Sequence, residues 1–556
     1  MITMVASIFQ QKRLSRILPS WTILLLVTLL LLIGTGECLS SPAAKKTATA
    51  TATTTKLFSS SVSTTSVDNN EKHYCFDAPL PERVEVLIAG GGLGGLATCI
   101  ALRNRGIDAH VIEASPTLLR GSTGTGIMIS PNGFSALDSI SISISKSSDS
   151  TTSNTSVTSS SSSDLSEKMK GFGARIRKQR IRFTDPTTGN VTKDIKLGGF
   201  EEQYGTDQYN VGWARAHEVL ASSIAPAAQA IHTGCKLESF EAYPNNDTGG
   251  KDDSVLVTLE DGRTVRASLL IGADGFGSKV RRLLAGDKKC RTRYNGQLLW
   301  NAIVPTDQFP TIAPHGEGQV EFITCGNDGQ AILAFDAGEG KTAWYLTLME
   351  EDAPAIVTNA IQDRNFGGFG PQPGVKSELM EVYEKWPMAL ECLAATPEDQ
   401  IFERRQADRP RLWKWSSRSR SRGAGGRVVL MGDAAHPMIP SLGQGTMVTW
   451  EDAAELATCL APLSGNGDGA DSTSTSTFDA SGVPKAVKDF VRRRAKRCAN
   501  VQSLSRERRM GRTLPKFFPL KMLAIFKMIR AKNGAGDLYG YTSRDAPADA
   551  TVDPTK

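Results

Sequence analysis

Short apolar runs separated by glycine divide much of the chain into pieces the length of a strand or a helix. The first run, residues 84–89, is rich in β-branched residues and predicts a buried strand. A glycine cluster follows, and residues 96–105 then carry the apolar spacing of a helix. A second predicted strand, residues 107–112, ends at Glu113. This succession predicts a βαβ unit over residues 82–114.

The middle of the chain changes to a strand pattern. Alternating apolar and polar residues around a turn signal predict a hairpin over 172–197, and residues 297–349 contain several more strands. After them come a short buried strand at 428–431, a helix at 451–460 and a long basic helix at 484–512. The pattern predicts an α/β protein in which a Rossmann-type domain is interrupted by a β-rich domain and followed by a C-terminal helical segment.

Residues 139–166 are mostly Ser and Thr, which cannot build a packed core. We therefore expect a disordered surface insertion there, and a second low-complexity loop at 465–482.

The N-terminal 79 residues have the composition of targeting segments. Residues 1–38 carry a basic start, an apolar run and then small residues, which is typical of a signal peptide. Residues 39–79 begin with a stretch rich in Ser, Thr and Ala and without an acid, which is typical of a transit peptide. This order predicts a plastid address reached through a secretory-type signal. An uncleaved N-terminal anchor and a secreted or endomembrane location stay open as alternatives.

Composition narrows the class of protein only a little. A chain of 556 residues with 40% hydrophobic residues is long enough for two or three globular units plus tails. The net charge of +6 is modest, and its excess is local, so a solvated basic face is expected rather than a nucleic-acid partner. The nine cysteines show no C-x-x-C pair, so neither a metal site nor a disulfide framework is predicted.

The glycine cluster after the first strand matches G-x-G-x-x-G with Gly90, Gly92 and Gly95. In such a turn the first glycine permits the tight bend, the second lets a pyrophosphate approach the backbone, and the third lets the helix pack on the strand. Glu113 stands at the spacing expected for a carboxylate that binds a ribose. The segment thus predicts a dinucleotide site, with the identity of the dinucleotide open.

Two later motifs identify a family. The second motif is Gly272-Ala273-Asp274-Gly275, continued by Ser278 and Arg281. The third runs from Gly432-Asp433-Ala434-Ala435-His436-Pro437 through Gly443-Gln444-Gly445 to Glu451-Asp452-Ala453. Together with the glycine turn, this set resembles the single-component FAD-dependent aromatic hydroxylases with the p-hydroxybenzoate hydroxylase fold, over about residues 82–512.

The resemblance implies a Rossmann-type FAD-binding domain interrupted by a β-rich substrate domain, and it implies site residues. Asp433 would bind a ribityl hydroxyl, and the helix that begins near Gly443, Gly445 and Thr446 would point its N–H groups at the flavin. The resemblance also places Asp274 in a motif tied to FAD and nicotinamide use. Arg120 and Arg215 stand where the family has FAD-binding arginines, although Glu218 replaces a usual leucine and puts the helix register in doubt.

Within this family, residues 396–410 look most like zeaxanthin epoxidase and its relatives. The resemblance implies an FAD monooxygenase that uses NAD(P)H or another reductant, and O2, to hydroxylate or epoxidise an electron-rich small molecule such as a carotenoid. No general base is recognised, which favours an alkene over a phenol. The bulky segment from Thr446 to Trp450 departs from the family's small residues. Aromatic or salicylate-type hydroxylation, isoprenoid reduction and a non-catalytic FAD-binding paralogue therefore stay open.

Residues 513–531 mix large apolar residues with lysines and predict either peripheral membrane contact or a helix packed on the body. The expected divisions of the chain are a signal peptide (1–38), a transit-like linker (39–79), an FAD-binding domain (80–290 and 401–482, with the insertion 139–166 and a substrate-domain hairpin in 170–210), a substrate domain (291–400), C-terminal helices (483–535) and a tail (536–556).

Overall fold

The structure is a computed structural model. It describes residues 79–118, 125–146, 155–158, 165–184, 191–224, 227–243, 254–308, 319–324, 331–354, 357, 370–417, 425–465, 478–507 and 537–541. The chain divides into two compact units, Met1–Asn69 and Asn70–Lys556, and all described residues lie in the second. The predictions for the targeting segments, for Arg120 and for residues 513–531 concern residues outside the described ones.

The first sheet is the Rossmann-type sheet that the sequence predicts. Strand β1 (Arg83–Ala89) pairs in parallel with β2 and with β13, and β13 pairs in parallel with β20. Parallel strands are covered on both faces, which explains why the second half of β1, residues 86–89, is apolar and buried throughout. The sheet has the order β10-β2-β1-β13-β12-β11, with β20 beside β13. The other strands are β2 (Ala109–Ile112), β10 (Ile231–His232), β11 (Leu237–Tyr243), β12 (Ser254–Leu259), β13 (Thr264–Gly272) and β20 (Val428–Leu430).

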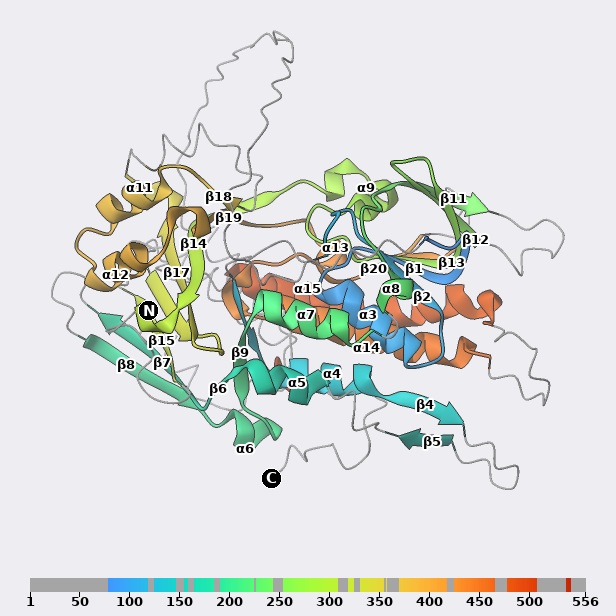
Figure 1. Cartoon of the computed structure of the whole chain (residues 1–556), viewed down its shortest axis with the longest axis horizontal. Helices are drawn as coiled ribbons and strands as arrows, with labels where there is room; N and C mark the ends of the chain where they lie inside the picture. The colour runs from blue at the N-terminus through green and yellow to red at the C-terminus, as the bar shows by residue number, and fades with distance from the viewer. Residues whose placement is uncertain are drawn as a thin grey trace, which may run out of the picture. The chain divides into compact units, whose positions relative to one another are not determined.

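Helix α14 (Gly445–Leu460) is the central helix of this domain. It packs against α3 (Leu93–Arg103), α4 (Pro131–Ser141) and α15 (Val483–Glu507), as Figure 1 shows. Eleven of its residues are buried, and three of these are the acids Glu451, Asp452 and Glu455. The segment that carries the third motif is thus held from three sides.

The β-rich domain is an eight-stranded sheet in the order β18-β19-β14-β17-β16-β15-β7-β8. One face packs on α11 (Val375–Val382) and α12 (Pro387–Ala395) through buried residues that include Trp300 and Trp344. The hairpin expected over 172–197 is confirmed as β7 and β8. The strands are β7 (Lys178–Thr184), β8 (Val191–Gly198), β14 (Arg293–Pro305), β15 (Gln319–Thr324), β16 (Ala331–Asp336), β17 (Lys341–Met349), β18 (Gly370–Pro371) and β19 (Phe402–Asp408).

The expected boundary at residue 400 is misplaced, because β19 pairs with β14 and belongs to the substrate sheet. The sequence hid this strand because its residues, Phe-Glu-Arg-Arg-Gln-Ala-Asp, lack an apolar alternation. A small sheet of β3 (Gly126–Ile129), β9 (Gln208–Gly212) and β6 (Ala174–Ile176) adjoins the substrate sheet.

The expectation of disorder over 139–166 is wrong for the part that is described. Residues 139–141 end α4, and β4 (Ser143–Lys146) pairs with β5 (Thr155–Thr158). Leu165 begins α5 (Leu165–Phe172) and is fully buried. Alternation of Ser with Ile suits a strand despite the low complexity.

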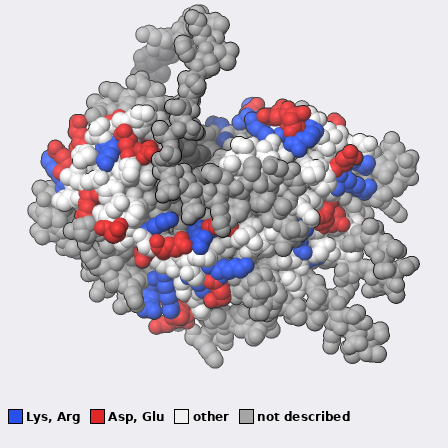
Figure 2. Space-filling model, viewed as in Figure 1, with Lys and Arg blue, Asp and Glu red and all other residues white. Residues whose placement is uncertain are grey.

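Residues 537–541 are not a free tail. The Tyr541 hydroxyl donates to Glu455 Oε1 at 3.1 Å, and Arg497 donates to the carbonyl oxygens of Asp537 and Leu538. Among the described residues, no helix has both the length and the apolar character needed to cross a membrane. On the face drawn in Figure 2, the described basic side chains lie in small groups interspersed with acidic ones. The expectation of no nucleic-acid partner stays a prediction.

Candidate cofactor-binding site

The glycine turn has the geometry that its spacing predicts. Gly90 has a φ of 112°, and a β-carbon there would lie 2.5 Å from the Ala273 carbonyl oxygen. A β-carbon at Gly95 would lie 1.9 Å from the carbonyl oxygen of Gly90. At Gly92, by contrast, no described atom lies within 4 Å of such a carbon. Two glycines are thus required by the fold, and the third leaves open space at the N-terminus of α3.

Glu113 lies beside this turn. Its Oε2 accepts a hydrogen bond from the Gly91 N–H at 2.9 Å, and its Oε1 accepts one from the Ser115 N–H at 2.9 Å. These two bonds fix the carboxylate at the end of β2, next to the open side of the turn. The position fits the ribose-binding carboxylate of a dinucleotide site.

The other side of the turn is held by two residues that sequence reasoning missed. His217 Nε2 lies 2.7 Å from the Gly91 carbonyl oxygen, and because a carbonyl can only accept, Nε2 carries the proton. The Trp213 ring stacks on His217, with 4.8 Å between ring centroids. Both residues are on one face of α7 (Trp213–Ser222), since they are four positions apart. That i, i+4 spacing was the available signal.

The structure does not bring Arg215 to the glycine turn. Arg215 is between Trp213 and His217 in sequence and therefore faces another direction on α7. Its guanidinium lies over the Phe172 ring at 3.8 Å and pairs with Glu218 and Glu339. The FAD-binding role expected for Arg215 stays a prediction, and these contacts do not place its guanidinium at the glycine turn.

Asp274 touches the first motif through its backbone and caps a helix through its side chain. The Asp274 carboxylate accepts hydrogen bonds from Ser278 Oγ at 2.5 Å and from the Val280 N–H at 3.0 Å, at the start of α9 (Lys279–Ala285). Burial raises the pKa of Asp274, although these hydrogen bonds oppose the rise. Its carboxylate thus shapes the turn that closes on Gly90, and its expected role in FAD binding stays a prediction.

Arg281 joins the second motif to the third. It is 1% exposed, and its guanidinium donates to the carbonyl oxygens of Ala434 and Ala435 at 3.1 and 2.8 Å, and to that of Pro410 at 2.6 Å. These carbonyls belong to α13 (Gly432–Ala435) and the segment before it. Arg281 therefore fixes the short helix that carries Asp433.

Asp433 is the one exposed residue between Met431 and Pro437, where every neighbour is buried. It follows β20 directly, at the carboxyl edge of the Rossmann-type sheet. Ligands of open α/β sheets bind at that edge. An accessible carboxylate in an otherwise buried turn fits the role predicted for Asp433, that of accepting a hydrogen bond from a ribityl hydroxyl.

The N-terminus of α14 is the second open helix end. Gly443 has a φ of 63°, and no described atom lies within 4 Å of a β-carbon built at Gly445. The first turn, which includes Thr446, has no acidic residue to compete for its N–H groups. Gln444 is fixed by Asn132 Nδ2 at 2.9 Å and by Ser130 Oγ at 3.2 Å. This end can stabilise negative charge on a bound ring.

The bulky residues of α14 belong to the core and leave this open end clear. β-Carbons built at Gly94 and at Gly432 would both collide with the Thr449 methyl group, at 2.4 and 2.9 Å. Trp450 is fully buried, and its Nε1 donates to the Leu93 carbonyl oxygen at 3.4 Å. The two glycines make room for Thr449, so the first and third motifs meet at this side chain.

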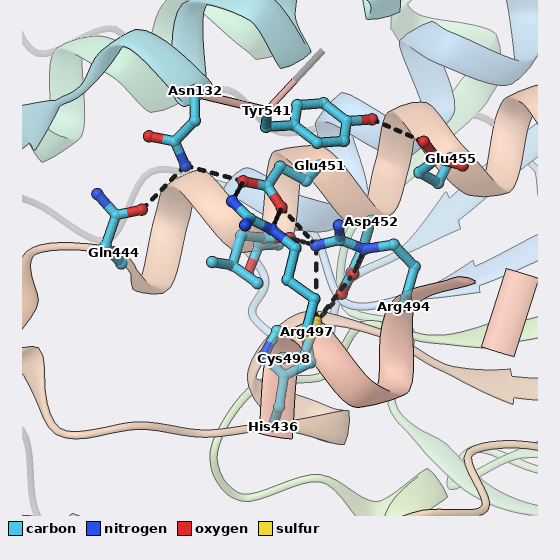
Figure 3. Close-up of polar contacts among 12 residues, drawn as sticks. Asn132, His436, Gln444, Glu451, Asp452, Glu455, Arg494, Arg497, Cys498 and Tyr541 are labelled. Atoms are coloured by element: carbon cyan, nitrogen blue, oxygen red, sulfur yellow. Dashed lines mark hydrogen bonds and ion pairs between the residues drawn. The ribbon is translucent and has the colours of Figure 1, made fainter. Parts of the chain in front are cut away.

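Behind the open end of α14 lies a buried ionic network, drawn in Figure 3. Arg497 binds Glu451 through two hydrogen bonds of 2.7 Å. Arg494 pairs with Glu451 and with Asp452, each at 2.8 Å, and His436 Nε2 lies 2.6 Å from Asp452 Oδ2. The network ties α13, α14 and α15 into one support.

Electrostatics in this network favour the charged forms. Burial alone would raise the pKa of Asp452, but His436 and Arg494 outweigh it and hold that pKa at about 2. Burial alone would lower the pKa of His436, but contacts with Cys498 and Asp452 raise it well above its usual value. His436, Asp452 and Cys498 have the atoms of a metal site, yet Arg494 already occupies Asp452 Oδ1. His436 therefore has a structural role, since its Nε2 and Arg494 share the Asp452 carboxylate.

The two open helix ends, the ribose-type carboxylate and Asp433 define a dinucleotide-binding domain of the flavin type. Residues 83–366 and 374–490 match the family described as FAD binding domain, and the chain belongs to that family. The predicted family, fold class and FAD cofactor are thereby confirmed.

The relatives include several oxygenases. Zeaxanthin epoxidase of Nicotiana plumbaginifolia is 29% identical over 68% of this chain and 48% of its own length. Aurachin C monooxygenase/isomerase of Stigmatella aurantiaca is 27% identical over 67% of this chain and 80% of its own length. 3-Hydroxybenzoate 6-hydroxylase 1 of Aquipseudomonas alcaligenes is 26% identical over 76% and 87%. The chain spans about half the length of the zeaxanthin epoxidases that it matches.

Solved structures agree on the fold. HpxO of Klebsiella pneumoniae, in complex with FAD and uric acid, matches with a TM-score of 0.57 at 20% identity and covers 81% of this chain and 95% of its own. The 2,6-dihydroxypyridine-3-hydroxylase of Arthrobacter nicotinovorans matches with a TM-score of 0.54 at 17% identity and covers 80% and 96%.

Proposed function

We propose that this protein is an FAD-dependent monooxygenase that uses NAD(P)H or another reductant, and O2, to place one oxygen atom on an uncharged, electron-rich substrate such as a carotenoid. The observation that carries the proposal is the N-terminus of α14, which is open at Gly445 and adjoins Met128 of β3 through Gly443. The family match and the three oxygenase relatives support it.

Bound FAD would supply the redox chemistry, including the activation of O2. The chain's own groups would bind and orient the cofactor. The open ends of α3 and α14 stabilise negative charge, Glu113 and Asp433 hold hydroxyl groups, and Arg281 keeps the Asp433 turn in place. The buried Arg494 network holds the start of α14 rigidly, so little reorganisation is needed when charge develops there.

No side chain described around this site has the geometry of a general base. His436 Nε2 is engaged with Asp452, and Tyr345 is engaged with the backbone of Gly126. Hydroxylation of a phenol usually draws on such a base, whereas oxygen transfer to an alkene does not. The arrangement therefore supports an alkene substrate and epoxidation.

The test is turnover by the purified protein after reconstitution with FAD. We expect flavin absorbance, and consumption of NAD(P)H and O2 that rises when a carotenoid with ring double bonds is added. Reductant consumption without O2 uptake would instead support an isoprenoid reductase. A protein that cannot be loaded with FAD would contradict both activities.

For location, we propose a plastid reached through a secretory-type signal, on the composition of residues 1–79. Fusion of these residues to a fluorescent protein tests this. Accumulation in the medium or in the endoplasmic reticulum would contradict it.

A further inference from the structure

Strand β9 has two faces, and they meet different parts of the protein. Tyr209 packs edge-on against Phe134 of α4, and Val211 is buried in the core of the FAD-binding domain. Because side chains alternate along a strand, Asn210 faces the opposite way. It shares that face with Met128, its cross-strand partner in β3.

That face lies against the substrate sheet, close to the open end of α14. A β-carbon built at Gly212, two residues after Asn210, would lie 3.6 Å from Ile303 Cδ1 of β14. A β-carbon built at Gly443 would lie 3.7 Å from Met128 Cε. The surrounding wall is apolar, and its members are Met128, Ile176, Ile303, Leu333, Phe335 and Ala343.

Asn210 is the unsatisfied polar group of this wall. It is 1% exposed, and neither its Oδ1 nor its Nδ2 has a hydrogen-bond partner among the described residues. The next amide on the same face, Gln208, donates to Ser130 Oγ at 3.0 Å. Buried polar groups are almost always paired, so an amide with both ends unpaired indicates a missing partner.

Other polar groups near this wall are already engaged. The Tyr345 hydroxyl donates to the Gly126 carbonyl oxygen at 2.8 Å and accepts from the Gly126 N–H at 3.1 Å. The Arg404 guanidinium donates to Thr125 Oγ1 at 3.0 Å. A ligand that reaches this wall would therefore meet apolar side chains, the paired Arg404 guanidinium and the unpaired Asn210 amide.

We propose that Asn210 binds an uncharged hydroxyl group of the substrate, so that the enzyme selects an apolar ring that carries a hydroxyl over the bare hydrocarbon and over a carboxylate. The inference rests on the proposed function and names its substrate class. A hydroxyl both donates and accepts, and so satisfies Oδ1 and Nδ2 together. A carboxylate can only accept, and a hydrocarbon leaves the amide unpaired.

The first test is the stability of the apoprotein. Asn210→Leu removes an unpaired buried amide while keeping the volume, so we expect an equal or higher melting temperature. Gln208→Leu is the matched control on the same strand, and because Gln208 is paired, its melting temperature should fall. A fall for Asn210→Leu as large as that for Gln208→Leu would show a structural amide and overturn the proposal.

The second test uses the FAD-loaded protein and three probes, 2-naphthol, naphthalene and 2-naphthoate, with binding followed by the change in flavin absorbance. The wild type should bind 2-naphthol about tenfold more tightly than naphthalene. Asn210→Leu should abolish this preference without lowering the affinity for FAD. The proposal is overturned if 2-naphthol does not bind, or if naphthalene or 2-naphthoate binds as tightly as 2-naphthol. It is also overturned if Asn210→Leu keeps the preference for 2-naphthol, or if this variant no longer binds FAD. A wild-type protein that binds no FAD would refute the proposed function. The comparison of melting temperatures would still show whether the Asn210 amide is unpaired.

Discussion

Gly92 and Gly95 stand three residues apart in one turn, and the structure gives them different reasons to be glycine. Gly95 has no room for a β-carbon, because the Gly90 carbonyl oxygen occupies that space. Gly92 has open space and a φ of −77°, which any residue can adopt. Both reasons agree with the roles that the sequence pattern predicts for the second and third glycines.

The first prediction separates these two roles. Gly92→Ala should leave the melting temperature of the apoprotein unchanged. It should lower the affinity for FAD by about tenfold or more, because the new methyl group stands where the pyrophosphate approaches. Gly95→Ala should lower the melting temperature itself. Flavin fluorescence titration and thermal unfolding measure the two effects. Equal FAD affinity for Gly92→Ala and the wild type would show that the open end of α3 is not the phosphate site.

The second prediction concerns Asp433. Asp433→Ala should leave the stability of the apoprotein unchanged, since the side chain is exposed. It should lower the affinity for FAD by about 10- to 150-fold, which corresponds to the loss of one hydrogen bond to a charged group. The same titration measures it. Unchanged affinity would mean that the accessible carboxylate has another purpose.

His436 gives a prediction about pH. Its pKa is raised in the folded protein, so its charge adds stability that is fully present below its unfolded pKa of about 6.5 and is lost as pH rises through the folded pKa. The stability difference between the wild type and His436→Asn should therefore be largest near pH 6 and shrink at alkaline pH. Chemical unfolding at several pH values measures it. A difference that grows with pH would contradict the assigned charge.

At the scale of elements, long periodic segments were predictable and polar strands were not. The βαβ unit, the β7–β8 hairpin and α15 follow the apolar spacing of their residues. Strand β19 and the pair β4–β5 escaped because their residues read as polar or low-complexity. Their pairing partners stabilise these strands, and a single sequence does not display such partners.

The basic helix shows why charge alone misleads. The expectation of a solvated face is wrong for Arg494, whose side chain is 3% exposed. Glu451 and Asp452 were the available signal, since adjacent acids in a buried helix need buried cations. Arg494 and Arg497 are three residues apart on one face of α15.

A substitution at Arg494 tests this support. Arg494→Met leaves Glu451 and Asp452 with one fewer buried cation, and we expect the free energy of unfolding to fall by about 3–5 kcal/mol. Arg492→Met, on the same helix with a side chain that is 75% exposed, should change little. Thermal or chemical unfolding compares them. Equal effects would show that the buried network adds nothing specific.

At the scale of the whole molecule, the chain order explains which parts of the site the sequence revealed. The three motifs are hundreds of residues apart, yet Gly90 meets Ala273, Arg281 meets Ala435, and Thr449 meets the glycine turn. Each motif carries a local signal, so the FAD site was predictable. Trp213 and His217 act through tertiary contacts, and their i, i+4 spacing was only a weak signal, whereas Asn210 carries none.

The central claim is that this FAD-binding protein transfers one atom of O2 to an uncharged substrate. The most direct measurement is the mass of products formed by the FAD-loaded protein with reductant, a panel of carotenoids and phenols, and isotopically labelled 18O2. The account predicts a product that gains one labelled oxygen atom, from a hydroxylated ring alkene in preference to a phenol. Reductant consumption that yields only unlabelled products would contradict it.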